Sequence, residues 1–184
     1  MRLLQLKRCK NNNKQLLNSL VVMYLQRKLS STLSTFKSLR FGTTSRAHSS
    51  HPYKVTVGIG GNVGDVKRRF EHLFIYLKKD KRVDLVQTSL ILKNPPFGFI
   101  DQDDFFNSII VLRTSMQPVA FLAYLMRLEK KFARKRSFAN APRTLDLDII
   151  FFDNRVVNLP NLKIPHLEWS KRESVLIPLM DMKK

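Results

Sequence analysis

The stretch Tyr53–Asp65 reads YKVTVGIGGNVGD and contains two different local signals. In its first half, Val55, Val57 and Ile59 alternate with polar or small residues, which is the period of a β-strand with one buried face. The second half is rich in glycine and interrupts this alternation, so the strand ends in a turn. Beyond the turn, apolar residues recur at helical spacing and predict an amphipathic helix that reaches Lys79: Val66, Phe70, Leu73, Phe74 and Leu77.

The same two periods continue along the rest of the chain. An alternating stretch at residues 83–94 predicts a second strand, which ends at a pair of prolines. A third strand is predicted at residues 105–114, a second helix at 117–135 and a fourth strand at 144–154. This order is that of the ferredoxin-like βαββαβ fold. We therefore expect an α+β domain with a four-stranded antiparallel sheet and both helices packed on one face, followed by a turn and a brief final helix.

The charge of the chain is strongly positive and unevenly distributed. Its 184 residues include 33 Lys and Arg but only 14 Asp and Glu. Such an excess normally indicates a polyanionic partner such as nucleic acid. Residues 1–50, however, hold ten of the basic residues and no acid, so about half of the net charge of +19 lies there. The charge of the remaining chain therefore does not predict a nucleic-acid partner.

Residues 1–50 have the composition of a targeting segment. They are acid-free, contain Arg and Ser, and can place Leu, Val and Tyr on one side of a helix, as a mitochondrial transit peptide does. A disordered extension or a misassigned start codon is the alternative, with a cytoplasmic location. We therefore divide the chain into a leader, residues 1–50, and a domain, residues 51–184, and leave the leader out of the fold.

The cysteine content and the apolar runs exclude two further classes of protein. The single cysteine, Cys9, excludes an internal disulfide framework and a zinc site built from cysteines. No apolar run reaches the length of a membrane span. Neither a disulfide scaffold nor a membrane partner is expected.

Two acids lie in the fourth predicted strand, within the stretch Pro142–Ile150, PRTLDLDII. Asp146 and Asp148 share one strand face because side chains alternate. Carboxylates about 6–7 Å apart on such a face repel each other unless a cation lies between them. Carboxylates completed by water and phosphate oxygens are the usual ligands of Mg²⁺. An isolated Asp-x-Asp more often marks a solvated strand face. The neighbouring residues are therefore needed to distinguish a metal site from such a face.

Those neighbours favour phosphate binding. Arg134, Arg136 and Arg143 bracket a loop that leads into the acid pair, and guanidinium groups bind phosphate through two hydrogen bonds. Basic residues are also common at helix C-termini, so each arginine alone could be a surface residue. His166 could contact phosphate or simply stabilise a turn. Asn107, flanked by aromatic and aliphatic residues, could bind a planar heterocycle or cap a strand edge.

Several stretches together resemble one family. They are GGNVGD at 60–65, FFNSIIVLRT at 105–114, RLEKKFARKR at 127–136, PRTLDLDIIFFDN at 142–154 and LKIPH at 162–166. They occur in the order found in the 6-hydroxymethyl-7,8-dihydropterin pyrophosphokinase family of folate biosynthesis. The resemblance covers residues 54–179, and the run PRTLDLD is highly specific. It implies a ferredoxin-like enzyme that transfers the pyrophosphoryl group of ATP to the hydroxymethyl oxygen of the pterin and releases AMP.

The resemblance also implies roles for individual residues. ATP is the co-substrate, and Asp146 and Asp148 hold two Mg²⁺ ions. Glu129 supports the site from the second helix. The catalytic set comprises these two acids and the three loop arginines. The residues that bind ATP are Arg134, Arg136, Arg143, Ile149, His166 and Arg172. The residues that bind the pterin are Asn94, Phe97, Phe105 and Asn107.

Four positions depart from the family pattern. Gly61 replaces the usual serine, and Ala133 replaces a glycine before the first loop arginine. Ser174 stands where many members place an aromatic residue against the pterin. Phe138 is the nearest equivalent of the loop tryptophan. These changes put in doubt a second aromatic contact with the pterin and the closure of the arginine loop.

The sequence is also compatible with two other functions, and the resemblance implies one association. A basic ferredoxin-like domain could bind RNA, but the first strand lacks the exposed aromatic residues which that needs. A nucleotidyltransferase also combines a glycine turn with Asp-x-Asp, but there the acids follow within about one helix, and here about eighty residues intervene. The family resemblance further implies a functional association with dihydropteroate synthase or dihydroneopterin aldolase.

Overall fold

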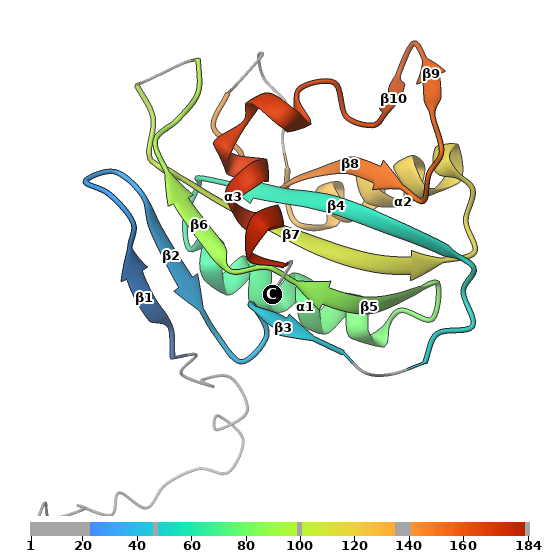
Figure 1. The fold of residues 1–184 in the computed structure, drawn as a ribbon, viewed down its shortest axis with the longest axis horizontal. Helices are drawn as coiled ribbons and strands as arrows, with labels where there is room; N and C mark the ends of the chain where they lie inside the picture. The colour runs from blue at the N-terminus through green and yellow to red at the C-terminus, as the bar shows by residue number, and fades with distance from the viewer. Residues whose placement is uncertain (1–22, 46–47, 99–100, 135–140, 183–184) are drawn as a thin grey trace, which may run out of the picture.

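The structure, a computed structural model, describes residues 23–45, 48–98, 101–134 and 141–182. Figure 1 shows a large twisted sheet with helices on both faces. In chain order the elements are β1 (Leu25–Lys28), β2 (Ser34–Lys37), β3 (Thr43–Thr44), β4 (Tyr53–Gly61), α1 (Val66–Lys79), β5 (Val83–Thr88), β6 (Ile91–Asn94), β7 (Phe105–Thr114), α2 (Pro118–Lys131), β8 (Asp146–Phe152), β9 (Val157–Leu159), β10 (Leu162–Ile164), the 3₁₀ turn Trp169–Lys171 and α3 (Glu173–Asp181).

The centre of the sheet has the predicted ferredoxin-like topology. β4 lies between β7 and β8, and β7 pairs on its other side with β5 and β6. All these pairs are antiparallel. Val55, Val57 and Ile59 of β4 are at most 2% exposed and belong to the main core beneath the helices. The α+β class and the antiparallel sheet are therefore confirmed, although the predicted second strand is divided into β5 and β6 at Ser89 and Leu90.

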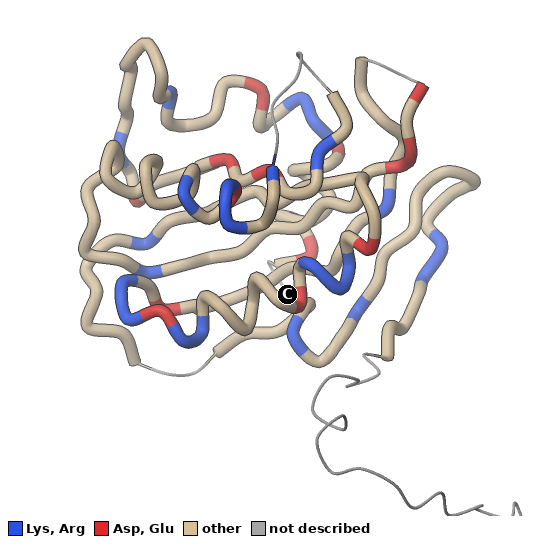
Figure 2. Tube along the Cα trace, turned by 180° about the vertical axis from the view of Figure 1, so that it is seen from behind, with Lys and Arg blue, Asp and Glu red and all other residues tan. Residues whose placement is uncertain are grey.

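The two predicted helices cover the same face of the sheet. Viewed from behind, α1 and α2 lie in front of the strands, with Lys and Arg along both helices (Figure 2). Phe70 and Leu73 of α1 and Phe121 and Leu125 of α2 are at most 1% exposed. The helices therefore bury their apolar stripes against the sheet and leave their charges in water.

The prediction of a four-stranded sheet was wrong, because the described residues already form a sheet of eight strands. Three of the additional elements come from the segment that was left out of the fold. β2 pairs with β6 and β1 pairs with β2, while β3 pairs with β5. Phe36 and Phe41 from this segment are 6% and 1% exposed and join the main core. The folded part of the chain therefore begins before residue 51.

A buried carboxylate holds this N-terminal segment against α1. Glu71 of α1 is 2% exposed. It accepts hydrogen bonds from Ser38 Oγ at 2.7 Å and from Arg40 Nη1 at 2.8 Å. A buried charge costs several kcal/mol unless it is paired and hydrogen-bonded, so residues 38–40 are needed to satisfy it. Residues 1–22 lie outside the described residues, and the transit peptide stays a prediction for that part alone.

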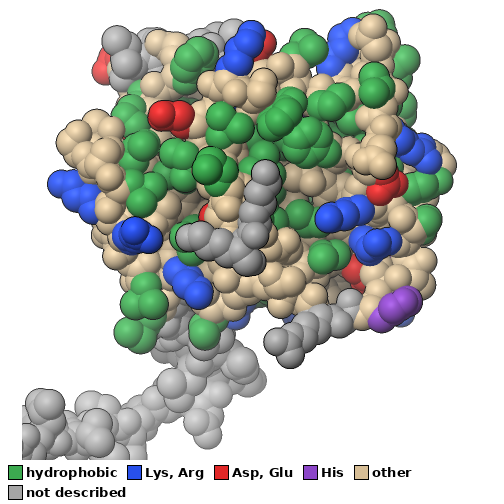
Figure 3. All heavy atoms as spheres, in the orientation of Figure 1, with side chains coloured by type: hydrophobic (Ala, Val, Ile, Leu, Met, Phe, Trp, Pro, Cys, Tyr) green, Lys and Arg blue, Asp and Glu red, His purple; other side chains and the backbone are tan. Residues whose placement is uncertain are grey.

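The last third of the chain contains more structure than the predicted turn and helix. β9 and β10 form a separate two-stranded sheet. α3 lies on the face of the large sheet opposite α1 and α2, where Val175 packs with Ile109 and Ile150. Figure 3 looks at this face and shows apolar side chains gathered across it; Phe151, Trp169 and Leu179 line a hollow there. Among the described residues, no helix is long and apolar enough to span a membrane.

Asp80, at the C-terminal end of α1, is hydrogen-bonded to the middle of α2 and gives a prediction for acid stability. Its carboxylate accepts hydrogen bonds from Arg82 at 2.6 and 2.9 Å and from the Tyr124 hydroxyl at 3.1 Å. These bonds, chiefly that from the Arg82 side chain, lower the pKa of Asp80 from 3.8 to about 2. A lowered pKa stabilises the fold above the unfolded value near 4, and this stability is lost as the pH falls towards 2.

We expect Asp80→Asn to lower the free energy of unfolding at pH 7 by about 1 kcal/mol. The expected loss is small because Arg82 is exposed and solvent screens its attraction to Asp80. The loss should become small near pH 2, where about half of the wild-type Asp80 side chains are protonated. Urea unfolding at pH 7, 4 and 2.5 measures both effects. An equal loss at all three pH values would contradict the electrostatic cause.

Candidate active site

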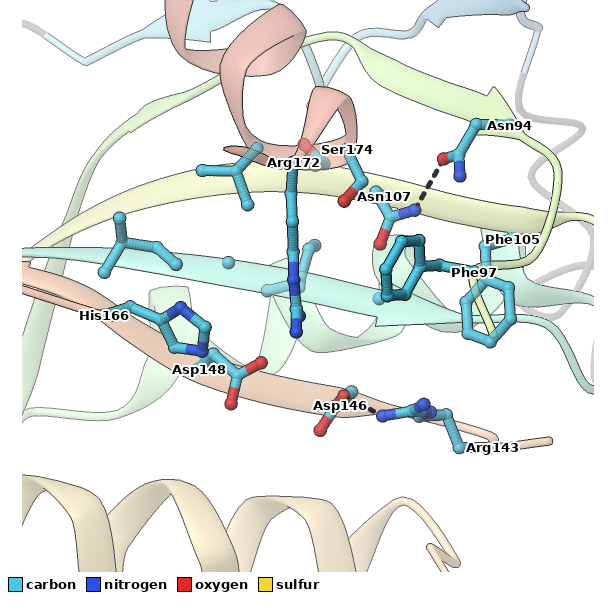
Figure 4. A pocket seen from close by; sticks show the side chains of 16 residues that line it. Asn94, Phe97, Phe105, Asn107, Arg143, Asp146, Asp148, His166, Arg172 and Ser174 are labelled. Carbon is cyan, nitrogen blue, oxygen red and sulfur yellow. Dashed lines mark hydrogen bonds and ion pairs between the residues drawn. The ribbon is translucent and has the colours of Figure 1, made fainter. Parts of the chain in front are cut away.

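Most of the predicted site residues line one pocket on the face of the sheet that carries α3. Figure 4 shows the acids on β8, the two asparagines and the phenyl rings at one end, and a histidine and an arginine at the other. The pocket lies over β4, β7 and β8, under the start of α3. Nine predicted residues line it: Asn94, Phe97, Phe105, Asn107, Arg143, Asp146, Asp148, His166 and Arg172.

Strand register brings the two halves of the site together. Gly60 of β4 is opposite Asn107 of β7 on one side and Asp146 of β8 on the other. Gly58 is opposite Asp148 in the same way. The two glycines lie on the face opposite Val57 and Ile59, so they form the floor between the acids and the amide. Side chains of any size at these positions would reduce the space for a ligand.

Asp146 is neutralised by arginines. Its Oδ1 lies 2.6 Å from Nη1 of Arg134, and its Oδ2 lies 2.5 Å from Nη1 of Arg143. Arg134 also pairs with Glu129, which is 4% exposed and accepts a hydrogen bond from the backbone N–H of Leu147 at 2.9 Å. Glu129 of α2 therefore holds both Arg134 and the acid-bearing strand in place.

Asp148 differs sharply from its neighbour. In the described part of the chain it has no ion pair or hydrogen bond to a cationic side chain. Burial raises the pKa of Asp148, and the charge of Asp146 raises it further, against weaker opposing effects of His166, Arg134 and Arg172. A partly buried carboxylate with a raised pKa and a second acid beside it favours a cation.

His166 and Arg172 reach the acids from the other side of the pocket. The Glu168 backbone N–H donates to Nδ1 of His166 at 3.2 Å. In the neutral ring the proton is therefore on Nε2, which is free to donate to a ligand. Arg172 directly precedes α3, and its side chain extends from there towards Asp148 (Figure 4). Both residues offer donors where a phosphate group would lie.

The opposite end of the pocket is aromatic and amidic. Asn107 donates from Nδ2 to Asn94 Oδ1 at 2.7 Å, which leaves its own Oδ1 directed to the pocket floor. Phe105 lies under the guanidinium of Arg143, 5.5 Å from ring centre to Cζ. Phe97 is 79% exposed. Flat rings beside paired amide groups are suited to a planar heterocycle.

Some predicted residues lie elsewhere. Ile149 does not line the pocket: it is 4% exposed and belongs to the core beneath the helices. The residue that shares the acids' face is Ile150, as the two-residue period would have indicated. Arg136 and Phe138 lie outside the described residues. Sequence reasoning missed six pocket residues as site residues: Gly58, Ile59, Gly60, Ser108, Ile150 and Val175.

The comparison with protein families bears directly on this pocket. Residues 56–184 match the family model described as 7,8-dihydro-6-hydroxymethylpterin-pyrophosphokinase. The chain belongs to this pyrophosphokinase family. The match includes all nine predicted residues that line the pocket, from Asn94 to Arg172.

Curated relatives carry the name of the same enzyme. The chain is 40% identical over 143 residues to the 2-amino-4-hydroxy-6-hydroxymethyldihydropteridine pyrophosphokinase of Campylobacter jejuni. The matched residues make up 78% of this chain and 91% of the relative. It is 39% identical over 128 residues to that of Helicobacter pylori, covering 68% and 78%. A longer relative, the Bifunctional protein FolKE of Lactococcus lactis, is 31% identical over 126 residues, which are 36% of its length.

The structure gives a physical reason for one departure from the pyrophosphokinase pattern. A Cβ atom at Gly61 would lie 2.5 Å from the carbonyl oxygen of Thr144. Because that contact is with backbone, a serine here would require the strand entry to shift. Ser174 lines the pocket, at the position where an aromatic was expected.

Gly60→Ala should weaken pterin binding without unfolding the protein. The new Cβ would lie 2.7 Å from Asn107 Oδ1, which is the end of a side chain and can rotate away. We expect the KM for the pterin to rise about 10-fold, the cost of one good hydrogen bond, with the KM for ATP changed less. Steady-state kinetics with each substrate varied measures this.

A double-mutant cycle with Asn107→Ala separates this cause from a general distortion of the floor. If Gly60→Ala acts through the amide, adding it to Asn107→Ala should cause little further loss. Full additivity would contradict the interpretation.

Proposed function

We propose that this chain transfers the pyrophosphoryl group of ATP to the hydroxymethyl oxygen of 6-hydroxymethyl-7,8-dihydropterin, giving AMP and the pterin diphosphate, with two Mg²⁺ ions. The observation that carries the proposal is the register that sets Asn107 and Asp146 on either side of Gly60. A heterocycle bound at the amide would have its substituent directed towards the acids and the arginines. The names of the relatives support the same reaction.

The residues present fit a pair of magnesium ions. Asp146 and Asp148 supply hard oxygen donors from one strand face, and Asp148 lacks a compensating partner in the described part of the chain. Among the described residues, no group of three or more His, Cys, Asp or Glu could hold a metal ion, so water and phosphate oxygens must supply the remaining ligands. When bound, the ions would neutralise the triphosphate and orient it.

The cationic side chains of the pocket act on the phosphates. Arg143 pairs with Asp146, and Arg172 extends from the start of α3 towards Asp148, so the two can contact different phosphate groups. His166 donates from Nε2 without needing to be charged. Such fixed donors stabilise the charge that spreads over the transferring group, which is the main contribution a protein makes to phosphoryl transfer. Arg134 and Glu129 hold Asp146 and β8 in register for this purpose.

The pterin end of the pocket orients the acceptor. The Asn107 amide can hydrogen-bond the edge of the ring system, and Phe105 and Phe97 can contact its faces. Asn94 fixes the orientation of the Asn107 amide. The hydroxymethyl group is then presented to the phosphate end, and this placement supplies much of the rate enhancement.

The rival functions fit the pocket less well. An RNA-recognition domain needs aromatic side chains on the central strands, whereas β4 presents Gly58 and Gly60 to this face. In a nucleotidyltransferase the acids would follow the glycine turn along the chain, and here they are brought to it only by the pairing of β4 with β8.

The test is incubation of the purified chain with ATP, Mg²⁺ and the pterin alcohol, followed by separation of the nucleotides. We expect AMP, formed only when the pterin is present. ADP as the product, or nucleotide turnover independent of the pterin, would contradict the proposal. The protein should retain residues from Met23 onwards because β1 to β3 belong to the fold.

Two further statements remain proposals. The longer relatives include the Bifunctional protein FolKE, which supports a functional association with other folate enzymes such as dihydropteroate synthase or dihydroneopterin aldolase. A mitochondrial location requires residues 1–22 to act as the targeting segment. Any cleavage would have to leave β2 (Ser34–Lys37) in place, since its removal would expose the edge of β6.

A further inference from the structure

Asn62 is a buried amide that none of the roles above uses. It directly follows β4 and is 5% exposed. Its Nδ2 donates to Gln102 Oε1 at 2.9 Å and to the carbonyl oxygen of Asp103 at 3.1 Å. Its Oδ1 accepts from the backbone N–H of Arg143 at 2.9 Å. All polar groups of the side chain are therefore engaged, and the partners fix the orientation of the amide.

These bonds join two segments that serve different substrates. Gln102 and Asp103 end the loop that leads into Phe105, at the pterin end of the pocket. Arg143 begins the run into β8 and pairs with Asp146 at the phosphate end. The backbone of Asn62 adds a third connection, because its N–H donates to the carbonyl oxygen of Arg143 at 3.0 Å.

The side chain of Asn62 provides two donors for the loop at Gln102 and Asp103 and one acceptor for the backbone N–H of Arg143. An aspartate keeps the acceptor for Arg143 but loses both donors to the loop. An alanine loses all three bonds. Arg143 also contacts the pterin end directly, because its guanidinium lies over the Phe105 ring. The two ends of the pocket are thus connected through one buried amide and one arginine.

We infer that Asn62 is a positioning residue which couples occupancy of the pterin end to the placement of Arg143 and Asp146 at the phosphate end. The inference rests on the proposed function, since it concerns the same two substrates. Coupling of this kind is reciprocal: a nucleotide that orders Arg143 should tighten pterin binding, and the pterin should tighten nucleotide binding by the same factor.

The test measures pterin affinity by equilibrium titration with and without a non-hydrolysable ATP analogue and Mg²⁺. In wild type we expect the analogue to tighten pterin binding. In Asn62→Asp we expect this tightening factor to fall at least about 5-fold, the lower end of typical coupling. The matched control is Val63→Ala, in the same turn and 39% exposed, which should keep the wild-type factor.

The readout separates positioning from simple stabilisation. A structural amide would lower the melting temperature of Asn62→Asp and leave the tightening factor unchanged, and that outcome overturns the inference. So does a wild-type protein in which the analogue does not affect pterin affinity. If Asn62→Asp does not fold, the deciding variant is Gln102→Ala, which removes one partly exposed partner of Asn62. A reduced factor supports the inference and an unchanged factor overturns it.

Failure of the proposed function is distinguishable from failure of this inference. Wild-type protein that forms no AMP from ATP and the pterin contradicts the reaction itself. Wild-type protein that forms AMP, with Asn62→Asp showing full coupling, leaves the reaction intact and removes only the role of Asn62.

Discussion

Replacement of Asp148 by asparagine should strongly reduce AMP formation and at the same time raise the melting temperature of the ligand-free protein. The two effects have one cause. Asp148 is partly buried beside Asp146, and burial raises its pKa, so its charged form is disfavoured in the folded state. Asparagine removes the repulsion between the acids but cannot supply the same metal ligand. We expect kcat to fall about 100- to 1000-fold, as when one charge-stabilising group is removed from an active site.

Asp146→Ala provides the contrasting variant. It should lose AMP formation to a similar degree, but its melting temperature should fall, because Arg134 and Arg143 lose their shared partner. Glu168→Gln makes the same change of charge at an exposed carboxylate outside the pocket and should behave as wild type. Thermal unfolding and AMP assays on the three variants test these statements. Lower thermal stability of Asp148→Asn would contradict the assignment of its charge as uncompensated.

The central fold could be predicted because the spacing of its apolar residues is regular and can be recognised within each short segment. Val55, Val57 and Ile59 alternate, Phe70, Leu73 and Leu77 follow a helix face, and tertiary contacts confirm both patterns. The N-terminal strands carry no such signal. All four residues of β1 are exposed, and the burial of Phe36 depends on an edge of the sheet that lies more than fifty residues further along the chain. The composition of this segment predicted a leader, but β2 and β3 pair with strands much later in the chain and belong to the fold.

The site could be predicted in part for the same reason. The shared face of Asp146 and Asp148 follows from the two-residue period of a strand, and the structure places both in the pocket. The closeness of Asn107 to Asp146 does not follow from local pattern, because it depends on the register of three strands. The family resemblance supplied that grouping. The same period identifies Ile150, whose side chain lines the pocket, where the resemblance implied Ile149.

Deletion of residues 1–45 should leave a protein that does not fold cooperatively, whereas deletion of residues 1–22 should have little effect on the described domain. The longer deletion removes Phe36 and Phe41 from the core, and losing a buried Phe side chain typically costs about 3–5 kcal/mol. The sum is comparable to the whole stability of a domain, about 5–15 kcal/mol. Circular dichroism and urea unfolding of the two truncated proteins measure the difference.

Point variants separate the contribution of the core from that of the buried ion pair. Phe41→Ala should cost about 3–5 kcal/mol. Arg40→Ala should cost about 2 kcal/mol, less than the full loss of a buried pair because Arg40 is partly exposed and Ser38 still donates to Glu71. Adding Glu71→Gln to Arg40→Ala should restore part of that loss, since it removes the unpaired buried charge. If the double variant were less stable than Arg40→Ala, the N-terminal segment would have to be held by its strand pairing and apolar contacts alone.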